Sequence, residues 1–323
     1  MSVRPVLSLG ETLIDLISSD EGATSLEEVR TLVVRPGGAP ANVVVALARL
    51  GIPSAFCGVV GVDPFASKLR STLSADGVDI SRLRGTADAD TTIAFAWKDA
   101  RGDGHFRLLR MADRLLDLPD VEAAGIEQTS AIVVGSVALA ANPSRRAVTR
   151  AVEIAADAGI PVCFDVNMRP TLWTSFSEAR EACQPILDHT TLLKLSLDDA
   201  RVLFREEIDA ESAIEAAAAT GAKFRVLTDG GRGAWFTSAG SSKPTRECYV
   251  PAFKVSAVEP TGAGDSFNAA IISRLIARNW MDLKREDVVF AAASGALTTT
   301  RRGAIEALPT LAEIETFLHA HSA

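Results

Sequence analysis

Short apolar runs alternate along the chain with longer stretches in which apolar residues recur every three or four positions. The short runs have the length and flanking turn residues of buried strands, and they are PVLSLG (5–10), SAFCGVVG (54–61), SAIVVGS (130–136), PVCFDV (161–166), TLLKLS (191–196) and FRVLTDG (224–230). Helices are expected at 39–51, 142–159, 177–188, 262–278, 286–298 and 310–320. This alternation predicts an α/β fold with a mainly parallel central sheet and helices on both faces.

Two stretches break the alternation, residues 12–35 and residues 91–110. The second contains TTIAFAWKD and GHFRLLR, a pattern typical of a β-hairpin. Together the two stretches predict a small sheet that stands off the main one as a β lid. Because the chain shows no linker, low-complexity tract or internal repeat, residues 1–323 are expected to form a single domain that carries this lid.

Composition and charge limit what the protein can bind. Of the 323 residues 47% are apolar, which is ample for a full core, and the net charge of −8 argues against a general affinity for nucleic acid or anionic membranes. The first residues lack a signal-peptide pattern, and the longest uncharged apolar run, AIVVGSVALAA, has 11 residues, too few to cross a bilayer. The four cysteines lie far apart without a C-x-x-C pair. We therefore expect a soluble cytoplasmic protein without zinc whose ligand is small.

The stretch EPTGAGDSFNAAIISRL (259–275) combines glycines, an acid and the start of a helix. The first backbone N–H groups of a helix lack intrahelical partners and attract anions such as phosphate, and Gly262 and Gly264 let the backbone approach one closely. Asp265 in this first turn then has a chemical use as a base. The alternative is that Thr261 caps the helix and Asp265 is an ordinary first-turn acid without a ligand.

Two further glycine-containing stretches suit a small polar ligand. In RPGGAPANVVVALARLG (35–51), Gly37 and Gly38 can bring backbone amides close to sugar hydroxyls, and Asn42 can donate and accept hydrogen bonds. In LTDGGRGAW (227–235), three glycines follow a strand and suit a nucleotide phosphate. Taken alone, the first stretch is more typical of a plain turn and helix start, and the second is also compatible with a hairpin turn.

The order of these motifs resembles that of the ribokinase-like (PfkB-type) carbohydrate kinases. GETLID, PGGAPANVVVALARLG, FDVNMRPTLW, KLSLDD, LTDGGRG, PTGAGDSFNAAI and RRGAIEALPT follow one another as in that family, over nearly the whole chain. Through GETLID, GGAPANV, FDVNMRPTLW and GAIEALPT the chain looks most similar to fructokinases. The resemblance implies a ribokinase-like fold and an enzyme that uses ATP and magnesium.

The resemblance also implies roles for particular residues. Asp265 matches the catalytic base, with the amides of Gly262, Ala263 and Gly264 as its anion hole. The positions that hold sugar hydroxyls in the family correspond to Asp15, Gly37, Gly38 and Asn42, and a lid arginine corresponds to Arg110. The positions along the phosphate path correspond to Asn167, Arg169 and Lys194. The nucleotide-binding turn corresponds to Thr228, Gly230 and Gly233.

The chain departs from the family pattern at two cation sites. Where relatives carry N-x-x-E or S-x-x-E to organise magnesium, this chain has Ser196 and the shorter Asp199. Where relatives often have an aspartate tied to a monovalent cation, it has Glu259. Asp199 is thus the expected magnesium residue and Glu259 a candidate for potassium, while S-x-x-D is also a plain capping arrangement.

The function implied by the resemblance is an ATP-dependent fructokinase that makes fructose 6-phosphate. A kinase for 2-keto-3-deoxygluconate, ribose or another sugar is the alternative within the family, and a catalytically silent sugar- or nucleotide-binding module is the alternative outside it. The presence of Asp265 argues against the silent module. The family also pairs through its lids, so a homodimer is expected, with the sugar as the small-molecule partner.

Overall fold

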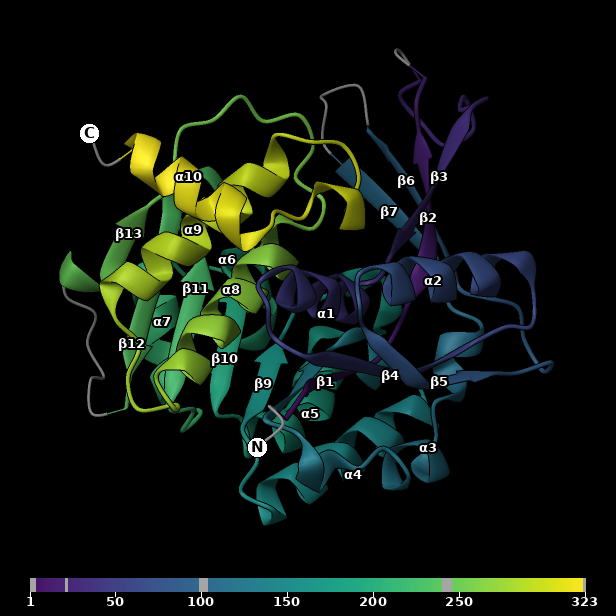
Figure 1. Cartoon of the computed structure of the whole chain (residues 1–323), viewed down its shortest axis with the longest axis horizontal. Helices are drawn as coiled ribbons and strands as arrows, with labels where there is room; N and C mark the ends of the chain where they lie inside the picture. Colours follow the sequence, from purple (N-terminus) through teal and green to yellow (C-terminus); the bar gives the residue numbers. More distant parts are fainter. Residues whose placement is uncertain (1–3, 21–22, 99–103, 240–245, 322–323) are drawn as a thin grey trace.

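Nine strands form the central sheet of the protein (Figure 1), whose computed structural model describes residues 4–20, 23–98, 104–239 and 246–321. In spatial order the strands are β13 (Tyr249–Pro251), β12 (Gly233–Ser238), β11 (Phe224–Thr228), β10 (Leu192–Ser196), β9 (Val162–Asp165), β8 (Ala131–Gly135), β1 (Val6–Leu9), β4 (Ser54–Val60) and β5 (Asp79–Gly85). All pairs from β11 to β5 are parallel, and β12 and β13 add antiparallel strands at one edge.

Helices cover both faces of this sheet. One face packs against α1 (Ala39–Arg49), α2 (Pro64–Ala75), α8 (Ala263–Ala277), α9 (Arg285–Thr299) and α10 (Leu311–His321). The other packs against α3 (Leu118–Glu122), α4 (Ser144–Asp157), α5 (Phe176–Leu187), α6 (Leu197–Leu203) and α7 (Ala210–Ala218). Strand β8 shows the reason, because Ala131 and Val133 join one core while Ile132 and Val134 join the other. The predicted α/β fold with a mainly parallel sheet is confirmed.

A second sheet of four strands stands beside the central one (Figure 1). Its spatial order is β3 (Leu32–Gly37), β2 (Leu13–Ser18), β6 (Ile93–Lys98) and β7 (Gly104–Leu109), with β2 and β6 parallel and the outer pairs antiparallel. Both stretches that interrupt the alternation in the sequence contribute strands to it; residues 99–103, between β6 and β7, lie outside the described residues. That this sheet moves as a lid on a single domain stays a prediction.

Helices α1 and α8 pack against each other and begin near the same cavity. Each is preceded by a glycine with positive φ, +103° at Gly38 and +80° at Gly262. A Cβ atom on Gly38 would lie 2.7 Å from the carbonyl oxygen of Glu11, and one on Gly262 would lie 3.2 Å from the Cα of Ala304. Both loops therefore need glycine for their backbone angles and for close packing.

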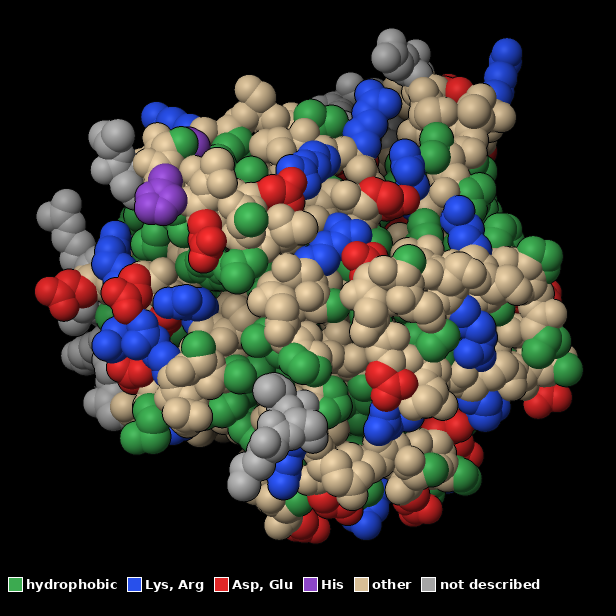
Figure 2. All heavy atoms as spheres, viewed as in Figure 1, with side chains coloured by type: hydrophobic (Ala, Val, Ile, Leu, Met, Phe, Trp, Pro, Cys, Tyr) green, Lys and Arg blue, Asp and Glu red, His purple; other side chains and the backbone are tan. Residues whose placement is uncertain are grey.

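The surface carries charges of both signs. On the face shown in Figure 2, acidic and basic side chains are interspersed over the helices. Within the described ranges, none of the helices combines the length and the apolar character that crossing a membrane requires.

Candidate active site

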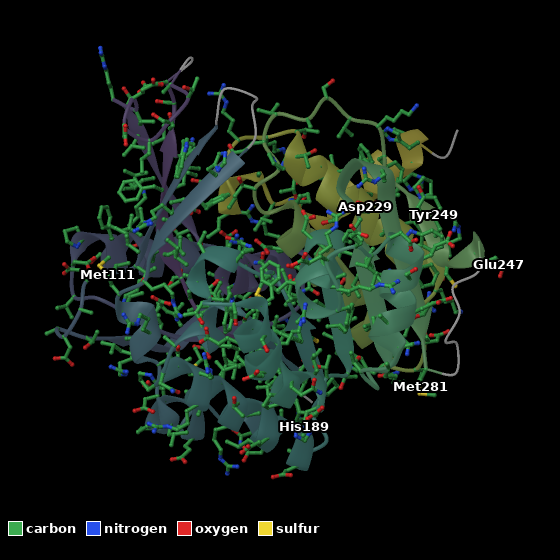
Figure 3. The ribbon with its side chains drawn as sticks, turned by 180° about the vertical axis from the view of Figure 1, so that it is seen from behind. Met111, His189, Asp229, Glu247, Tyr249 and Met281 are labelled. Carbon is green, nitrogen blue, oxygen red and sulfur yellow. The ribbon has the colours of Figure 1, made fainter. Side chains whose placement is uncertain are left out.

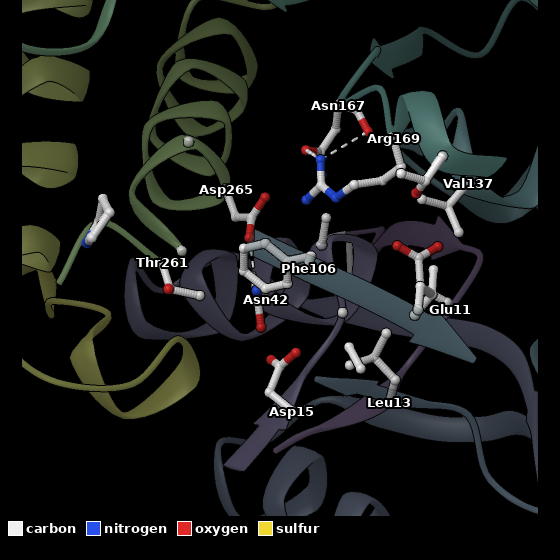
Figure 4. A pocket seen from close by; sticks show the side chains of 18 of the residues that line it. Glu11, Leu13, Asp15, Asn42, Phe106, Val137, Asn167, Arg169, Thr261 and Asp265 are labelled. Atoms are coloured by element: carbon white, nitrogen blue, oxygen red, sulfur yellow. Dashed lines mark hydrogen bonds between the residues drawn. The ribbon is translucent and has the colours of Figure 1, made fainter. Parts of the chain in front are cut away.

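A cavity of about 290 Å³ lies where the second sheet meets the first turns of α1 and α8 (Figure 4). Strands β9 and β10 of the central sheet also end there, which is where parallel α/β sheets bind ligands. Its lining consists of Glu11, Leu13, Asp15, Gly38, Ala39, Asn42, Ala94, Phe106, Leu108, Val137, Asn167, Arg169, Thr171, Lys194, Pro260, Thr261, Gly262, Gly264 and Asp265. The mixture of polar groups and small apolar faces suits a small hydrophilic ligand.

Asp265 projects into this cavity from the first turn of α8. Its Oδ2 accepts a hydrogen bond from Nδ2 of Asn42 at 2.7 Å, which fixes the orientation of the carboxylate. Burial raises the pKa of Asp265 above its ordinary value, opposed by the Asn42 hydrogen bond and by the charges of Lys194 and Arg169. A buried carboxylate held in this way is a suitable general base.

The backbone before Asp265 forms a tight turn. The amide of Ala263 donates to the carbonyl of Pro260 at 3.1 Å, so this amide is engaged within the loop. Gly262 and Gly264 line the cavity, whereas Ala263 does not. The predicted anion hole is thus centred on the glycines and the start of α8, and the implied use of the Ala263 amide does not match this structure.

Lys194 lies beside the same loop and is paired with a buried acid. Its Nζ donates to Asp165 at 3.0 and 3.2 Å, and Asn268 donates to the same carboxylate at 3.4 Å. A Cβ on Gly264 would lie 3.2 Å from this Nζ. Burial alone lowers the pKa of Lys194, but the Asp165 and Asp199 charges and the Asp165 hydrogen bond together raise it. The loop therefore has a fixed positive charge next to it.

Asp15 enters the cavity from β2 of the second sheet. Its carboxylate packs over Gly37, where a Cβ would lie 2.1 Å from Oδ2. Burial raises the pKa of Asp15 to about 7, with a further increase from the charge of Asp265 and a decrease from that of Arg169. Gly37 thus contributes by leaving room for Asp15.

Arg169 bridges the central sheet and the second sheet. It follows β9, and its Nη1 donates to Oδ1 of Asn167 at 2.6 Å (Figure 4). Its guanidinium carbon lies 5.9 Å from the ring centroid of Phe106 in β7, within the range of a cation–π contact. Asn167 has a positive φ of 38°, which turns its side chain toward the guanidinium.

The structure brings most of the expected residues together. The cavity lining includes Asp15, Gly38, Asn42, Asn167, Arg169, Lys194, Gly262, Gly264 and Asp265, which come from both sheets and from two helices. Gly37 adjoins it through Asp15. These residues are the candidate sugar and phosphoryl-transfer groups.

The expected nucleotide-binding turn lies at the same edge of the central sheet but outside the cavity. Thr228 ends β11 beside Ser196 of β10, and Gly230 begins a 3-10 turn, η5 (Gly230–Arg232), that leads to Gly233 in β12. Figure 3 shows this region near Asp229 and Tyr249. Their placement at the carboxyl end of β11 is compatible with a nucleotide that approaches the loop before α8 from that side.

The cavity lining does not include Arg110, so its implied role as a lid arginine stays a prediction. Arg110 follows the end of β7, and its Nε donates to Oδ2 of Asp113 at 2.6 Å while Nη2 donates to Oγ of Ser144 at 3.3 Å. These contacts hold the guanidinium outside the cavity lining. The side chains that β7 presents to the cavity are Phe106 and Leu108.

Both carboxylate oxygens of Asp199 are engaged within the protein, and one oxygen of Glu259 is. Oδ1 of Asp199 accepts from the amide of Met168 at 2.7 Å, and Oδ2 accepts from the amide and hydroxyl of Ser196 at 2.7 and 2.8 Å. Oε2 of Glu259 accepts from the amide of Gly303 at 3.1 Å. The described residues contain no group of three or more metal-binding side chains. Asp199 is therefore the capping residue of α6, the alternative recognised in the sequence.

Sequence reasoning missed several cavity residues, including Glu11, Phe106, Leu108, Val137 and Thr171. Glu11 had a usable signal, because a charged residue directly after a buried parallel strand lies at the edge where ligands bind. Phe106 and Leu108 reach the cavity only through the pairing of β6 and β7, which the sequence pattern of one hairpin does not fix.

Two solved structures with a similar fold are described as a ribokinase and a fructokinase. A putative ribokinase II from Escherichia coli, crystallised with ATP and magnesium, superposes with a TM-score of 0.87 at 29% identity and covers 99% of this chain and 100% of its own. Fructokinase from Vibrio cholerae, solved with fructose, ADP and calcium, gives a TM-score of 0.84 at 30% identity and covers 98% and 100%. The fold is ribokinase-like, and together with the site it defines a small-molecule kinase.

Sequence comparison narrows this class to one family. The chain belongs to the pfkB family of carbohydrate kinases, whose model matches residues 4–311. Fructokinase-1 of Zea mays is 36% identical over 317 residues, which is 96% of each protein. The resemblance inferred from the motif order, and the conclusion that the protein is a carbohydrate kinase, are confirmed.

Proposed function

We propose that the enzyme transfers the γ-phosphoryl group of ATP to the 6-hydroxyl of fructose. The observation that supports this best is the position of Asp265, in the first turn of α8 and facing a cavity that Asp15 and Asn42 also line. The cavity of about 290 Å³ suits a substrate near the small end of the roughly 300–1,000 Å³ range of small-molecule sites. Fructose is favoured because the matched plant proteins and the Vibrio protein are fructokinases.

The reacting hydroxyl lies beside Asp265 in this proposal. The carboxylate removes its proton while the hydroxyl oxygen forms a bond to the γ-phosphorus, and the bond from that phosphorus to the bridging oxygen breaks to release ADP. The start of α8, with Gly262 and Gly264, stabilises the charge on the transferred group. Lys194 and Arg169 offset the repulsion between this group and the carboxylate.

The nucleotide occupies the side of the loop that faces Thr228, Gly230 and Gly233. Magnesium accompanies the ATP phosphates and neutralises part of their charge, as it does for relatives solved with nucleotide and metal ions. Asp199 does not fit as its direct ligand, since both of its carboxylate oxygens accept hydrogen bonds from within the protein. A potassium ion near Glu259 stays a prediction, supported by a double mutant of the Vibrio fructokinase that holds potassium.

A coupled assay of ADP release across a panel of sugars tests the proposal. Fructose should give the highest kcat/KM, and the product should be the 6-phosphate by NMR. A higher value with 2-keto-3-deoxygluconate or ribose would assign a different kinase of the family. Tight ATP binding without turnover on any sugar would indicate a silent binding module.

Replacing Asp15 by alanine should weaken use of the sugar far more than use of ATP. A buried sugar hydroxyl would lose its partner, so the transition-state stabilisation reported by kcat/KM for fructose should fall by about 1–3 kcal/mol. KM for ATP should change little. Asn42→Ala should give a similar loss and should also lower kcat, because Asn42 orients Asp265. Steady-state kinetics with each substrate varied in turn measures both effects. Equal losses for both substrates would mean general damage to the fold.

The second sheet is proposed to act as a lid and to pair two subunits. Its outer strands expose large apolar side chains, with Val33 and Val34 in β3 at 36% and 40% and Phe106 and Leu109 in β7 at 41% each. Val34 and Leu109 lie on the face turned away from the cavity, whereas Val33 and Phe106 lie on the cavity face. Contact between two of the outer faces would remove Val34 and Leu109 from water. Closure over a bound sugar would limit the wasteful hydrolysis of ATP.

Light scattering at micromolar protein should therefore give the mass of a dimer. Val34→Asp should raise the dimer dissociation constant by more than about tenfold, while Met281→Asp, on an exposed residue away from the second sheet, should not. Addition of fructose should change the fluorescence of Trp97, which stacks on His105 in the β6–β7 pair. If the protein is a fully active monomer, and if adding fructose does not change the fluorescence of Trp97, both the proposed dimer and the proposed lid closure are contradicted.

We propose that the enzyme is located in the cytoplasm, because its buried cysteines are free thiols. Cys57, Cys163 and Cys183 are buried free thiols whose pKa burial raises, to about 12 for Cys57 and Cys183. ATP, the proposed phosphoryl donor, is available in the same compartment.

A further inference from the structure

Glu11 is a buried acid in the cavity without an assigned task. It lies between β1 and β2, where the chain passes from the central sheet to the second sheet, and its side chain is only 4% exposed. Among the described residues its Oε2 has no hydrogen-bond partner. A buried carboxylate oxygen without a donor is costly, so a donor is expected to come from the cavity that Glu11 lines.

Glu11 lies across the cavity from the reacting groups. Figure 4 shows its carboxylate beside Val137, on the opposite side of the view from Asp265 and Thr261, and both sides line the same cavity. A substrate whose reacting hydroxyl lies at Asp265 therefore extends its other end toward Glu11. Leu13 and Val137 flank this end and offer no polar side-chain group.

The charges around Glu11 keep it available as an acceptor. Burial raises the pKa of Glu11 to about 7, the charge of Asp113 raises it further, and the charges of Arg110 and Arg169 lower it. Arg110 is held through Nε by Asp113 and through Nη2 by Ser144, while its buried Nη1 has no hydrogen-bond partner among the described residues. It therefore acts on Glu11 through its charge, and slightly above neutral pH the carboxylate is ionised.

We propose that Glu11 is a specificity-determining residue whose carboxylate accepts a hydrogen bond from a sugar hydroxyl remote from the phosphorylated one. The proposal rests on the proposed function, since the orientation of the sugar follows from Asp265 as the base. In fructose bound with its 6-hydroxyl at Asp265, the donor is the hydroxyl on C1 or the anomeric hydroxyl on C2.

The same residue discriminates against sugar acids. A substrate carboxylate at the end remote from Asp265 would be repelled by the negative charge of Glu11. It would also have no hydrogen-bond donor for the unpartnered Oε2 of Glu11. Arg169 also lines the cavity and its positive charge acts on Glu11, so the discrimination is the part that Glu11 itself contributes, while Phe106 and Leu108 of β7 add no charge. Glu11 therefore favours an uncharged sugar over 2-keto-3-deoxygluconate, whose carboxylate stands in place of a hydroxyl.

Analogues that lack one hydroxyl test the contact directly. With the wild-type enzyme at about pH 8, either 1-deoxyfructose or 2,5-anhydromannitol, which lacks the anomeric hydroxyl, should lose roughly 10- to 100-fold in kcat/KM relative to fructose. Glu11→Ala should lose a similar factor with fructose and then treat fructose and that analogue alike, within about threefold. If each analogue loses the same factor in both proteins, Glu11 does not contact a sugar hydroxyl and the proposal fails.

Discrimination against acids supplies a second readout. Glu11→Gln keeps the shape and one acceptor but removes the charge, so the ratio of kcat/KM for fructose to that for 2-keto-3-deoxygluconate should fall by roughly tenfold or more. KM for ATP should not change. Glu127→Gln, an exposed acid away from the cavity, is the matched control and should leave this ratio unchanged. An unaltered ratio in Glu11→Gln would overturn the proposed selectivity.

Calorimetric binding separates this proposal from the proposed function. If the wild type fails to phosphorylate fructose, the kinase assignment to fructose falls. The role of Glu11 is then decided by binding measurements. Glu11→Ala should still lower the affinity for the neutral sugar that binds. Glu11→Gln should still reduce the difference in affinity between that sugar and the corresponding sugar acid. If the wild type and both variants bind these sugars equally, the proposed role of Glu11 is rejected, and the proposed function is not affected by that result.

Discussion

Asp265→Asn should lower kcat by about 10²–10⁴, the usual worth of general-base catalysis, while ATP binding stays near that of the wild type. Asparagine keeps the shape of the side chain but cannot take the proton from the sugar hydroxyl. Stopped-flow or quenched-flow measurement of the phosphoryl-transfer step, with ATP affinity from calorimetry, separates chemistry from binding. A variant that keeps most of its turnover when chemistry limits the rate would rule out Asp265 as the base.

The pH dependence of the wild type provides an independent check on Asp265. The base must be ionised to act, and burial raises its pKa, so kcat should fall on acidification at a pH above the ordinary pKa of an aspartate, 3.8. The acid limb should disappear in Asp265→Asn. Because burial also raises the pKa of Asp15 and of Glu11 to about 7, Asp15→Ala and Glu11→Ala are the controls that show whether the limb survives without those groups.

Lys194→Met should destabilise the fold by about 3–5 kcal/mol, because it leaves the buried carboxylate of Asp165 without its cation. The side chains of Lys194 and Asp165 are 7% and 5% exposed and lie 3.0 Å apart. Urea denaturation measures the loss in the free energy of unfolding. Activity should also be lost, since the positive charge beside Gly264 is removed.

An exposed ion pair gives the matched control for Lys194. Arg201 and Asp198 lie 2.7 Å apart with side chains 46% and 86% exposed, so Arg201→Met should cost no more than about 1 kcal/mol. The double variant Asp165→Asn, Lys194→Met should recover part of the lost stability, because it removes the unpaired charge. A loss in Lys194→Met no larger than in the control would show that Asp165 does not depend on its partner.

The strands of the parallel sheet could be predicted because both of their faces are buried. PVLSLG and TLLKLS are nearly continuous apolar runs, and the structure forms β1 and β10 within them. The sequence pattern did not indicate the edge strand β5, because DISRLRG is mostly polar and has one buried residue, Leu83. The antiparallel strands β12 and β13 and the helices α2 and α7 were also missed, because their apolar positions are few or interrupted.

The candidate site could be predicted as far as it lies within continuous motifs. Asp265, Asn42 and Gly38 each sit at a helix start that the local sequence marks, and each lines the cavity. Phe106 reaches it only because β6 pairs with β2 in parallel and β7 with β6, a register that depends on residues far apart in the sequence. Arg110 does not line the cavity, because the chain turns away at the end of β7 and the side chain contacts Asp113 and Ser144.

The hydrogen bond between Asn42 and Asp265 spans 223 positions of the chain. During synthesis, at roughly 5–20 residues per second, about ten to forty seconds separate the emergence of the two residues from the ribosome. In that interval α1 can pack on β1 and β4, but its side that packs against α8 has no partner and faces solvent or other proteins. Loop closure over this separation delays the assembly of the base until late in folding. Catalytic activity therefore requires a nearly complete polypeptide. Nascent chains that stall before α8 should be inactive and should expose an apolar surface on α1 to which chaperones can bind.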